Sequence, residues 1–113
     1  MEPPKKKFVM LQSVRDFMRG QPGDVKQELN GLIWMLEQNG ALSAPYAEKM
    51  SDTDLFVLRV IQAGNIRVFY VYGTNDFVYG IHGYVKKTEE IPQQELEHAR
   101  KITRELIAAG VVK

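Results

Sequence analysis

The sequence predicts an α+β domain in which helices pack on one face of a small antiparallel sheet. Two observations predict this class. Apolar residues recur with helical spacing early in the chain and again near its end, and residues 55–86 between them form three runs rich in β-branched and aromatic residues. With 113 residues, 44% of them apolar, the chain is long enough for one domain with a hydrophobic core. We expect a single domain over residues 1–113, in which residues 1–6 form a flexible tail.

The predicted order of elements is β-α-α-β-β-β-α. Residues 8–11 form either an edge strand or the entry to the first helix, which Ser13 is expected to cap and Gly20 to end. A longer helix over residues 22–40 is opened by Pro-Gly-Asp and ended by Asn-Gly, because Asn and Gly tolerate the left-handed conformation at a helix terminus. Residues 41–54 are predicted to form a loop.

Three strands and a final helix complete the predicted fold. The strands are joined by two short connections that contain Gly and Asn, as hairpin turns do. The last helix starts at Pro92, a favoured first position, and ends at Gly110. The strands of this antiparallel meander are residues 55–62, 66–72 and 77–86, and its connections are residues 63–65 and 73–76.

The lengths of the two connections fix which strand residues share a face of the sheet, because side chains alternate along each strand. With loops of three and four residues, Gln62 pairs with Ile66 and Tyr72 pairs with Phe77. One face of the sheet is then an uncharged core face, formed by Phe56, Leu58, Val60, Ile66, Val68, Tyr70, Tyr72, Phe77, Tyr79, Ile81 and Val85.

The opposite face of the predicted sheet collects basic side chains. In this register Arg67 lies opposite His82, and Arg59 is a diagonal neighbour of Arg67. No carboxylate is expected beside them. The polar residues on this face are Arg59, Arg67, His82, Tyr84 and Lys86, set among Val57, Ile61, Phe69, Val71 and Val78.

The charges are unevenly distributed along the chain. The formal net charge is only +1, from 15 basic and 14 acidic residues, which taken alone argues against a nucleic-acid partner. Residues 55–87, however, carry four basic residues against the single acid Asp76. We therefore expect one locally cationic surface that attracts anions although the whole protein is nearly neutral.

The composition also excludes several classes of protein. The chain contains no cysteine, which excludes disulfide frameworks, thiolate zinc sites and thiol nucleophiles. Its apolar runs are far shorter than the roughly 20 residues that span a bilayer, and its first residues lack the apolar core of a signal peptide. We expect a soluble, cytoplasmic protein with no membrane partner.

The side chains of the predicted basic face suit a phosphodiester. The guanidinium groups of Arg59 and Arg67 can clamp phosphate oxygens and stabilise the additional charge of a pentacoordinate transition state. A histidine such as His82 can move protons to or from ribose oxygens, and Lys86 can serve as a further electrostatic or acid/base group. The aromatic side chains that could stack on a base are Tyr84 and Phe69.

The most specific sequence pattern is IHGYVKKTEEIPQQELEHARK at residues 81–101. Together with LFVLRV at 55–60 and IRVFY at 66–70, it resembles the toxins of the RelE/HigB type, in particular their phage-derived HigB-like branch. Members of that branch read approximately L-[FW]-E-L-R, then R-[VI]-[LF]-[YF], then H-[GH]-F-x-K-[KR]-T-x-x-x-P-x-x-E-[IL]-x-x-A. The residues that match the third pattern are His82, Gly83, Tyr84, Lys86, Lys87, Thr88, Pro92, Glu95 and Ala99.

The resemblance implies a RelE-like, microbial-ribonuclease-type fold and the function of a toxin in a type II toxin-antitoxin pair. Such toxins enter the ribosomal A site and cut the bound mRNA without a metal or cofactor. The 2′-hydroxyl attacks the adjacent phosphate and leaves a 2′,3′-cyclic or 3′-phosphate end. The implied partners are the ribosome, mRNA and a helix-turn-helix antitoxin encoded beside the toxin, and operator DNA is bound only through the complex with the antitoxin.

The resemblance also implies roles for individual side chains. The arginines expected to hold and stabilise the phosphate are Arg59 and Arg67, and the acid/base candidates are His82 and Lys86. The side chains expected to position the substrate are Lys87 and Tyr84.

Two other functions stay open at this point. A non-catalytic toxin of the ParE type would bind DNA gyrase with the same scaffold, but the His-Tyr-Lys cluster of residues 82–86 argues against it. A small structural or interaction domain is the third possibility. Val57 stands where the family pattern has Glu, which makes the general base more dependent on His82.

Overall fold

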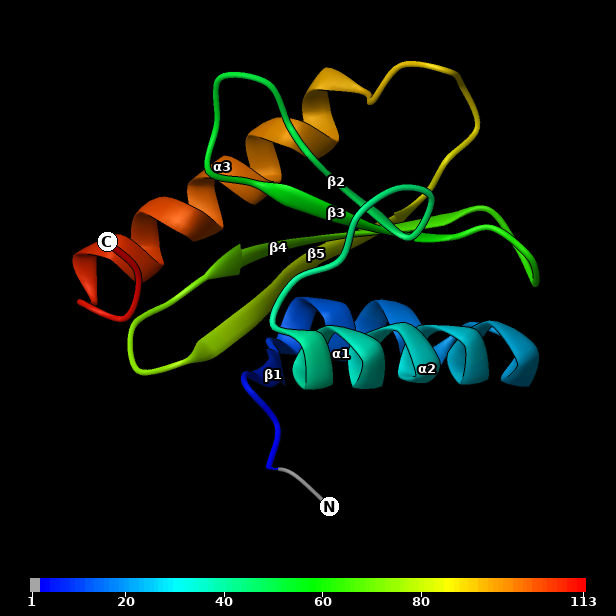
Figure 1. Ribbon diagram of the computed structural model, residues 1–113. Helices are drawn as coiled ribbons and strands as arrows, with labels where there is room; N and C mark the ends of the chain where they lie inside the picture. Colours follow the sequence, from blue (N-terminus) through cyan, green and yellow to red (C-terminus); the bar gives the residue numbers. More distant parts are fainter. Residues whose placement is uncertain (1–2) are drawn as a thin grey trace.

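The structure is a computed structural model that describes residues 3–113, and it shows the predicted α+β class (Figure 1). Five strands form one sheet in the order β1-β5-β4-β3-β2. No helix within residues 3–113 is long and apolar enough to cross a membrane. The elements are β1 (Lys7–Met10), α1 (Gln12–Arg19), α2 (Gly23–Asn39), β2 (Ala47–Lys49), β3 (Phe56–Val60), β4 (Ile66–Tyr72), β5 (Phe77–Val85) and α3 (Gln93–Ala108).

Two strands differ from the predicted antiparallel meander. β1 is the edge strand expected as one alternative, and it pairs parallel to β5, so the sheet is mixed. β2 lies within the predicted loop 41–54 and pairs antiparallel with β3. Its three residues are too short a run for alternation to be recognised in the sequence.

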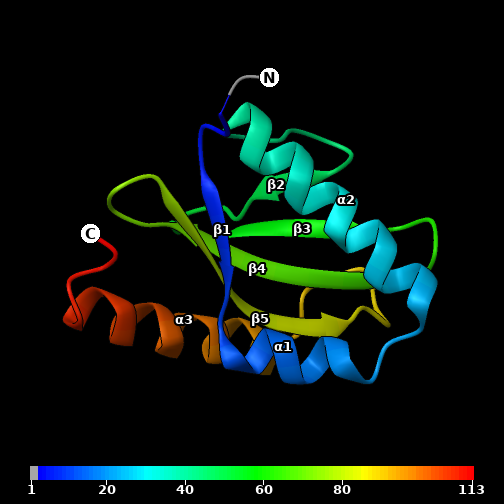
Figure 2. The ribbon, with the colours of Figure 1, turned by 90° about the horizontal axis from the view of Figure 1, so that it is seen from below.

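The helices cover both faces of the sheet, and the prediction that they lie on one face is wrong. α1 and α2 lie below the sheet in Figure 1 and in front of it in Figure 2, whereas α3 lies above the sheet in Figure 1. The cause is visible in β4, whose sequence IRVFYVY is apolar on both alternating sets of positions. A strand that is apolar on both faces needs cover on both.

Each face of the sheet therefore has its own hydrophobic core. The core under α1 and α2 includes Val14, Leu29, Leu36, Leu58, Val68 and Tyr70. The core under α3 includes Val57, Phe69, Val71, Ile81, Tyr84 and Ala99.

The register of β3 and β4 keeps the predicted faces but shifts by two residues. Val60 pairs with Ile66, so residues 61–65 form a loop of five residues in place of the predicted three. A shift by two residues preserves which side chains share a face. Arg59 consequently lies directly opposite Arg67 and not diagonal to it.

A β-bulge at Ile81 changes the register between β4 and β5. Tyr72 pairs with Val78 before the bulge, and Phe69 pairs with His82 after it. The extra residue moves the partner of each β4 residue by one position and restores the predicted faces for the end of β5. The residues before that point take the opposite faces, so the predicted faces are wrong for Phe77, Val78, Tyr79 and Ile81.

Ser13 supports this bulge and does not cap α1 as predicted. The N-cap residue is Leu11, which makes no side-chain cap bond. The Ser13 hydroxyl donates to the carbonyl oxygen of Ile81, and the backbone N–H of Leu11 donates to that of Gly80. The start of α1 thus supplies a donor to the carbonyl oxygen of Ile81, the extra residue of the bulge.

Two glycines let aromatic side chains approach β5 beside the bulge. A Cβ atom on Gly83 would lie 2.6 Å from the ring of Phe17 in α1, and one on Gly80 would lie 2.7 Å from the ring of Phe8 in β1. Both distances are shorter than any ordinary contact. The absence of a side chain at these two positions of β5 allows the rings of Phe17 and Phe8 to lie directly on the strand.

Glu28 of α2 fastens the loop that leads into β4. Its carboxylate accepts hydrogen bonds from the backbone N–H groups of Ile61, Gln62 and Ala63, at 2.7 to 3.2 Å. Burial alone would raise the pKa of Glu28, but these three bonds outweigh it, and the pKa lies below its usual value of 4.5. An ionised Glu28 therefore holds the β3–β4 loop in place.

The helix ends follow the prediction. Gly40 after α2 and Gly110 after α3 both have a φ angle of +81°, which other residues rarely adopt. Of the predicted flexible tail, residues 1–2 lie outside the described residues. The backbone amides of Lys5 and Lys6 donate to a carbonyl oxygen of α2.

Candidate functional site

A row of three polar side chains crosses the sheet on the face against which α3 packs. Arg59 of β3, Arg67 of β4 and Tyr84 of β5 are Cα partners on neighbouring strands. The structure thus brings the two predicted arginines together, but it places Tyr84 and not His82 opposite Arg67. His82 is the preceding residue on the same face of β5 and lies opposite Phe69.

Arg67 is the buried member of the row, with 5% of its surface exposed. Its Nη1 atom donates to Oδ1 of Asn65 at 3.2 Å and to the preceding backbone carbonyl at 3.1 Å. Burial lowers the pKa of Arg67, and the charge of Arg59 lowers it further, while Tyr84 and Glu48 act in the opposite direction. Because a guanidinium stays protonated in proteins, Arg67 provides a positive charge in a largely dry environment, where it acts strongly on a bound anion.

Arg59 is partly exposed, and not all of its N–H donors are hydrogen-bonded. Its Nη1 atom donates to the carbonyl oxygen of Pro45 at 3.3 Å, whereas its Nε atom is buried without a hydrogen-bond partner within residues 3–113. Neither Arg59 nor Arg67 forms an ion pair with a carboxylate of the described residues. Two adjacent guanidinium groups without an ion-pair partner are able to bind an oxyanion.

Tyr84 completes the row with a neutral donor. It is 5% exposed, and its hydroxyl group has no hydrogen-bond partner in the part of the chain that the structure describes. Burial raises the pKa of Tyr84; Arg67 lowers it in part, and the carboxylates of Glu95 and Glu48 raise it. The hydroxyl group therefore stays protonated near neutral pH and can donate a hydrogen bond.

Phe69 supports the row from within the core. Its ring is fully buried and stacks on Tyr84, with ring centroids 5.7 Å apart, and on His82 at 6.3 Å. The prediction that Phe69 stacks on a base is incompatible with this burial. The ring instead holds the side chains of Tyr84 and His82 in position.

His82 is paired with a carboxylate that the sequence analysis did not expect. Its Nε2 atom lies 3.1 Å from Oε2 of Glu95 in the first turn of α3, and its ring stacks on that of His98, with centroids 4.9 Å apart. The expectation that no carboxylate lies beside the basic residues is wrong, because α3 covers this face. Glu95 belongs to the sequence pattern of residues 81–101, but the pattern does not reveal which strand the helix covers.

A second acid lies on the same face. Glu48 of β2 is the Cα partner of Val57, which in turn lies opposite Phe69. A carboxylate therefore stands on the strand next to Val57, the position at which the family pattern has Glu. Sequence reasoning missed Glu48 because β2 was predicted as a loop. Within residues 3–113, no three His, Asp or Glu side chains gather closely enough to hold a metal ion.

Asn65 ties the end of β5 to the row. Its side-chain nitrogen donates to the carbonyl oxygen of Lys86 at 2.7 Å, and its backbone oxygen accepts from the N–H of Lys86 at 2.8 Å. Its Oδ1 atom is the acceptor for Arg67. Asn65 thus places the backbone of Lys86 relative to the buried arginine, a role that its position in a predicted turn did not indicate.

An open groove gives several of the predicted residues access to solvent. It has a volume of about 460 Å³ and is lined by His82, Tyr84, Lys87 and Glu95, among others. Lys87 is exposed, and Lys86 is partly buried at the end of β5. The structure therefore brings His82, Tyr84 and Lys87 together at one opening.

Comparison with known proteins adds a family to this geometry. The family described as phage derived protein Gp49-like (DUF891) matches residues 16–104, which include all of the side chains described above for the site. The chain belongs to the Gp49-like family. This family is associated with toxin-antitoxin systems. No curated protein matches the chain.

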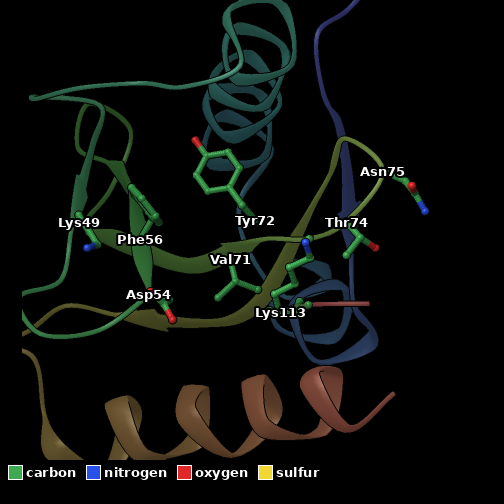
Figure 3. A pocket seen from close by; sticks show the side chains of 10 residues that line it. Lys49, Asp54, Phe56, Val71, Tyr72, Thr74, Asn75 and Lys113 are labelled. Carbon is green, nitrogen blue, oxygen red and sulfur yellow. The ribbon is translucent and has the colours of Figure 1, made fainter. Parts of the chain in front are cut away.

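A larger groove of this Gp49-like protein lies elsewhere. Figure 3 shows this groove, of about 780 Å³, at the other end of β3 and β4, where Phe56 begins β3 and Tyr72 ends β4. Lys49, Asp54 and Lys113 give its lining mixed charges. None of the site residues predicted from the sequence lines it, so size alone does not identify the site in this Gp49-like chain.

Proposed function

We propose that this Gp49-like protein is a toxin of the RelE/HigB type and acts as a ribosome-dependent endoribonuclease on mRNA. The proposal rests on the row of Arg59, Arg67 and Tyr84, in which the Nε atom of Arg59 and the hydroxyl group of Tyr84 are buried without partners within residues 3–113. Buried polar groups are nearly always hydrogen-bonded, so two such donors in one row that reaches a groove support an acceptor that arrives with a ligand. A phosphodiester fits two cationic donors and one neutral donor in a row.

The proposed reaction is attack of a ribose 2′-hydroxyl on the adjacent phosphorus atom. The bond from O2′ to phosphorus forms and the bond from phosphorus to O5′ breaks. A general base takes the proton of the 2′-hydroxyl, and a general acid gives a proton to the departing O5′. Arg59 and Arg67 would stabilise the negative charge that grows on the phosphoryl oxygens as phosphorus becomes pentacoordinate.

His82 and Lys86 are the proposed acid/base pair. The contact between Nε2 of His82 and Glu95 supports this role for His82. A carboxylate that accepts one ring N–H orients the imidazole and leaves its other nitrogen for proton transfer. Tyr84 and Lys87 would position the ribose and a flanking phosphate at the groove.

The proposed regulator is a helix-turn-helix antitoxin encoded beside the toxin gene. The association of the family with toxin-antitoxin systems supports this partner. Expression of the toxin alone should arrest growth, and co-expression of the neighbouring reading frame should restore growth and yield a complex that co-purifies. Growth that is unaffected by the toxin would contradict this assignment.

Mapping of mRNA ends in a cell-free translation reaction tests the ribonuclease. The purified protein is expected to create new mRNA ends only when ribosomes translate the message. Replacing Arg59 by Gln should slow cleavage by about 10²-fold, the loss typical of one transition-state donor. Arg15→Gln is the matched control, because it removes the same charge from α1, on the other side of the sheet.

Two outcomes would contradict the proposed reaction. Intact messages in the presence of translating ribosomes and folded protein would show that this protein is not an mRNA endonuclease. Inhibition of supercoiling by purified gyrase, together with intact mRNA, would instead assign it to the toxins of the ParE type.

A further inference from the structure

The outward side of α3 carries a run of positive charge, which we name the α3 ridge. It consists of His98, Arg100, Lys101 and Arg104, all of them exposed. We propose that the α3 ridge binds the phosphate backbone of RNA, in continuation of the site beneath the helix. This inference rests on the proposed ribonuclease function and adds a second binding surface to it.

The cations of the α3 ridge have no internal partners. No acidic residue occurs over residues 98–104. None of the ridge side chains forms an ion pair with a carboxylate within the described residues, whereas elsewhere Lys6 pairs with Asp76 and Arg19 with Asp16. The positive charge of the ridge is therefore available to an external anion.

The shape of the ridge favours an extended polyanion. Its four side chains line an open groove of about 460 Å³, in which Glu97 is the one acidic lining residue. Residues three and four positions apart are neighbours on a helix surface, so Arg100 and Lys101 each lie next to Arg104, and the three form a cluster of charge over about one turn of α3. Such a cluster neutralises successive phosphates of a nucleic-acid backbone and concentrates anions at the surface.

His98 connects the ridge with the candidate site. Its ring lines the ridge groove and stacks on the ring of His82, with centroids 4.9 Å apart. His82 in turn lines the site groove with Tyr84 and Lys87. An RNA strand whose phosphodiester lies at Arg59 can leave the site over the two imidazoles and continue along α3. Message and ribosomal RNA share this backbone chemistry, and separate binding assays distinguish them.

The test compares two triple variants that remove the same number of charges. Arg100→Gln/Lys101→Gln/Arg104→Gln neutralises the ridge, and Gln keeps a high helix propensity at all three exposed positions. Lys26→Gln/Lys49→Gln/Lys113→Gln is the control, with the same change in net charge at exposed positions outside α3. Circular dichroism and thermal unfolding verify that both variants are folded.

Binding is measured with a fluorescent single-stranded RNA by anisotropy and with vacant ribosomes by co-sedimentation, at several salt concentrations. The ridge variant is expected to bind at least one of these about tenfold more weakly at low salt. For single-stranded RNA, the slope of log affinity against log salt should fall by about 2, from roughly 0.7 per lost phosphate contact. Loss with the free RNA identifies a message-binding surface, and loss with ribosomes alone identifies ribosomal RNA.

Three results would overturn the inference. Equal weakening by both triple variants would show a dependence on net charge alone, and unchanged binding by the ridge variant would show that α3 makes no RNA contact. Unchanged RNA binding combined with loss of antitoxin binding would assign the ridge to an acidic protein segment. Failure of the ribonuclease proposal looks different, because the native protein would then cut no mRNA while the binding difference between the variants persisted.

Discussion

At the scale of single residues, the two arginines of the row have unequal structural roles. Arg67 is almost fully buried and makes two hydrogen bonds, whereas Arg59 is partly exposed and makes one long bond to a backbone carbonyl. Both arginines have the same proposed role, which is to stabilise the phosphate in the transition state. Variants of the two arginines should therefore differ in stability although both lose activity.

We expect Arg59→Gln and Arg67→Gln each to lower mRNA cleavage by about 10²-fold or more. Arg67→Gln should also lower the free energy of unfolding by about 1 to 3 kcal/mol, because it disrupts a buried, hydrogen-bonded charge. Arg59→Gln should stay within about 1 kcal/mol of the native protein. Urea unfolding alongside the cleavage assay checks this, and equal stability of the two variants would contradict the burial argument.

Asn65 is expected to act as a positioning residue for Arg67 and Lys86. Asn65→Ala removes both side-chain bonds and should reduce the cleavage rate by about tenfold at saturating ribosomes. Asn65→Asp keeps an acceptor for Arg67 but loses the donor to the carbonyl oxygen of Lys86. It should cleave poorly, because its carboxylate competes with phosphate for the guanidinium and no longer holds the backbone of Lys86. Full activity of Asn65→Asp would exclude this role.

At the scale of elements, β5 depends on close packing beside its bulge. Gly83→Ala would place a Cβ atom 2.6 Å from the ring of Phe17 and should lower the free energy of unfolding by about 1 to 3 kcal/mol. Activity should fall as well, because His82 and Tyr84 flank this glycine.

A matched control for Gly83→Ala is Gly31→Ala in α2, where a Cβ atom would meet nothing within 4 Å. There the substitution should stabilise the protein by up to about 1 kcal/mol, through the higher helix propensity of Ala. If the loss of stability in Gly83→Ala is caused by the clash with Phe17, the additional change Phe17→Leu should recover part of that stability. Thermal unfolding of the three variants measures these differences.

The hydrogen bonds between Glu28 and the loop that precedes β4 should make a pH-dependent contribution to stability. The folded-state pKa of Glu28 is lowered, so its stabilising effect is complete above its unfolded value of about 4.5 and is lost as the pH falls through the folded-state pKa. Near neutral pH, Glu28→Gln should therefore be less stable by about 1 kcal/mol, a modest figure because the carboxylate is partly solvated. Unfolding of both proteins as a function of pH should show the difference shrinking in acid, and a constant difference would argue against the ionised form.

At the scale of the whole molecule, the helices on both sides of the sheet determine how exposed the basic face is. The sequence predicts a face that is open to substrate, but α3 packs against this face through the buried Ala99. Arg67 and Tyr84 are consequently almost fully buried, and solvent reaches His82, Tyr84 and Lys87 through a groove. The predicted face, whose strands carry almost no acidic residues, is therefore a partly enclosed site in the structure, and α3 adds Glu95 to it.

Local sequence signals predicted most of the elements. Runs of β-branched and aromatic residues predicted β3 and β4, the helical spacing of apolar residues and the terminal glycine predicted α2, and Pro92 and Gly110 predicted the ends of α3. β2 was not predicted, because three residues are too few to show a recognisable period. The bulge in β5 was not predicted, because it is stabilised by contacts from outside the strand. Ser13 and the close approach of Phe17 are contacts across more than 60 residues of chain, which a reading of local spacing cannot supply.

The sequence by itself determined which side chains are available for chemistry, namely two strand arginines, a histidine, a tyrosine and a lysine pair, because residue types and strand parity are local properties. The tertiary structure alone decided their partners. The shift by two residues between β3 and β4 set Arg59 opposite Arg67, and the register of β5 with its bulge set Tyr84 opposite Arg67. The docking of α3 brought Glu95 to His82. Side-chain pairing depends on how elements pack against each other, and that packing is a property of the folded chain as a whole.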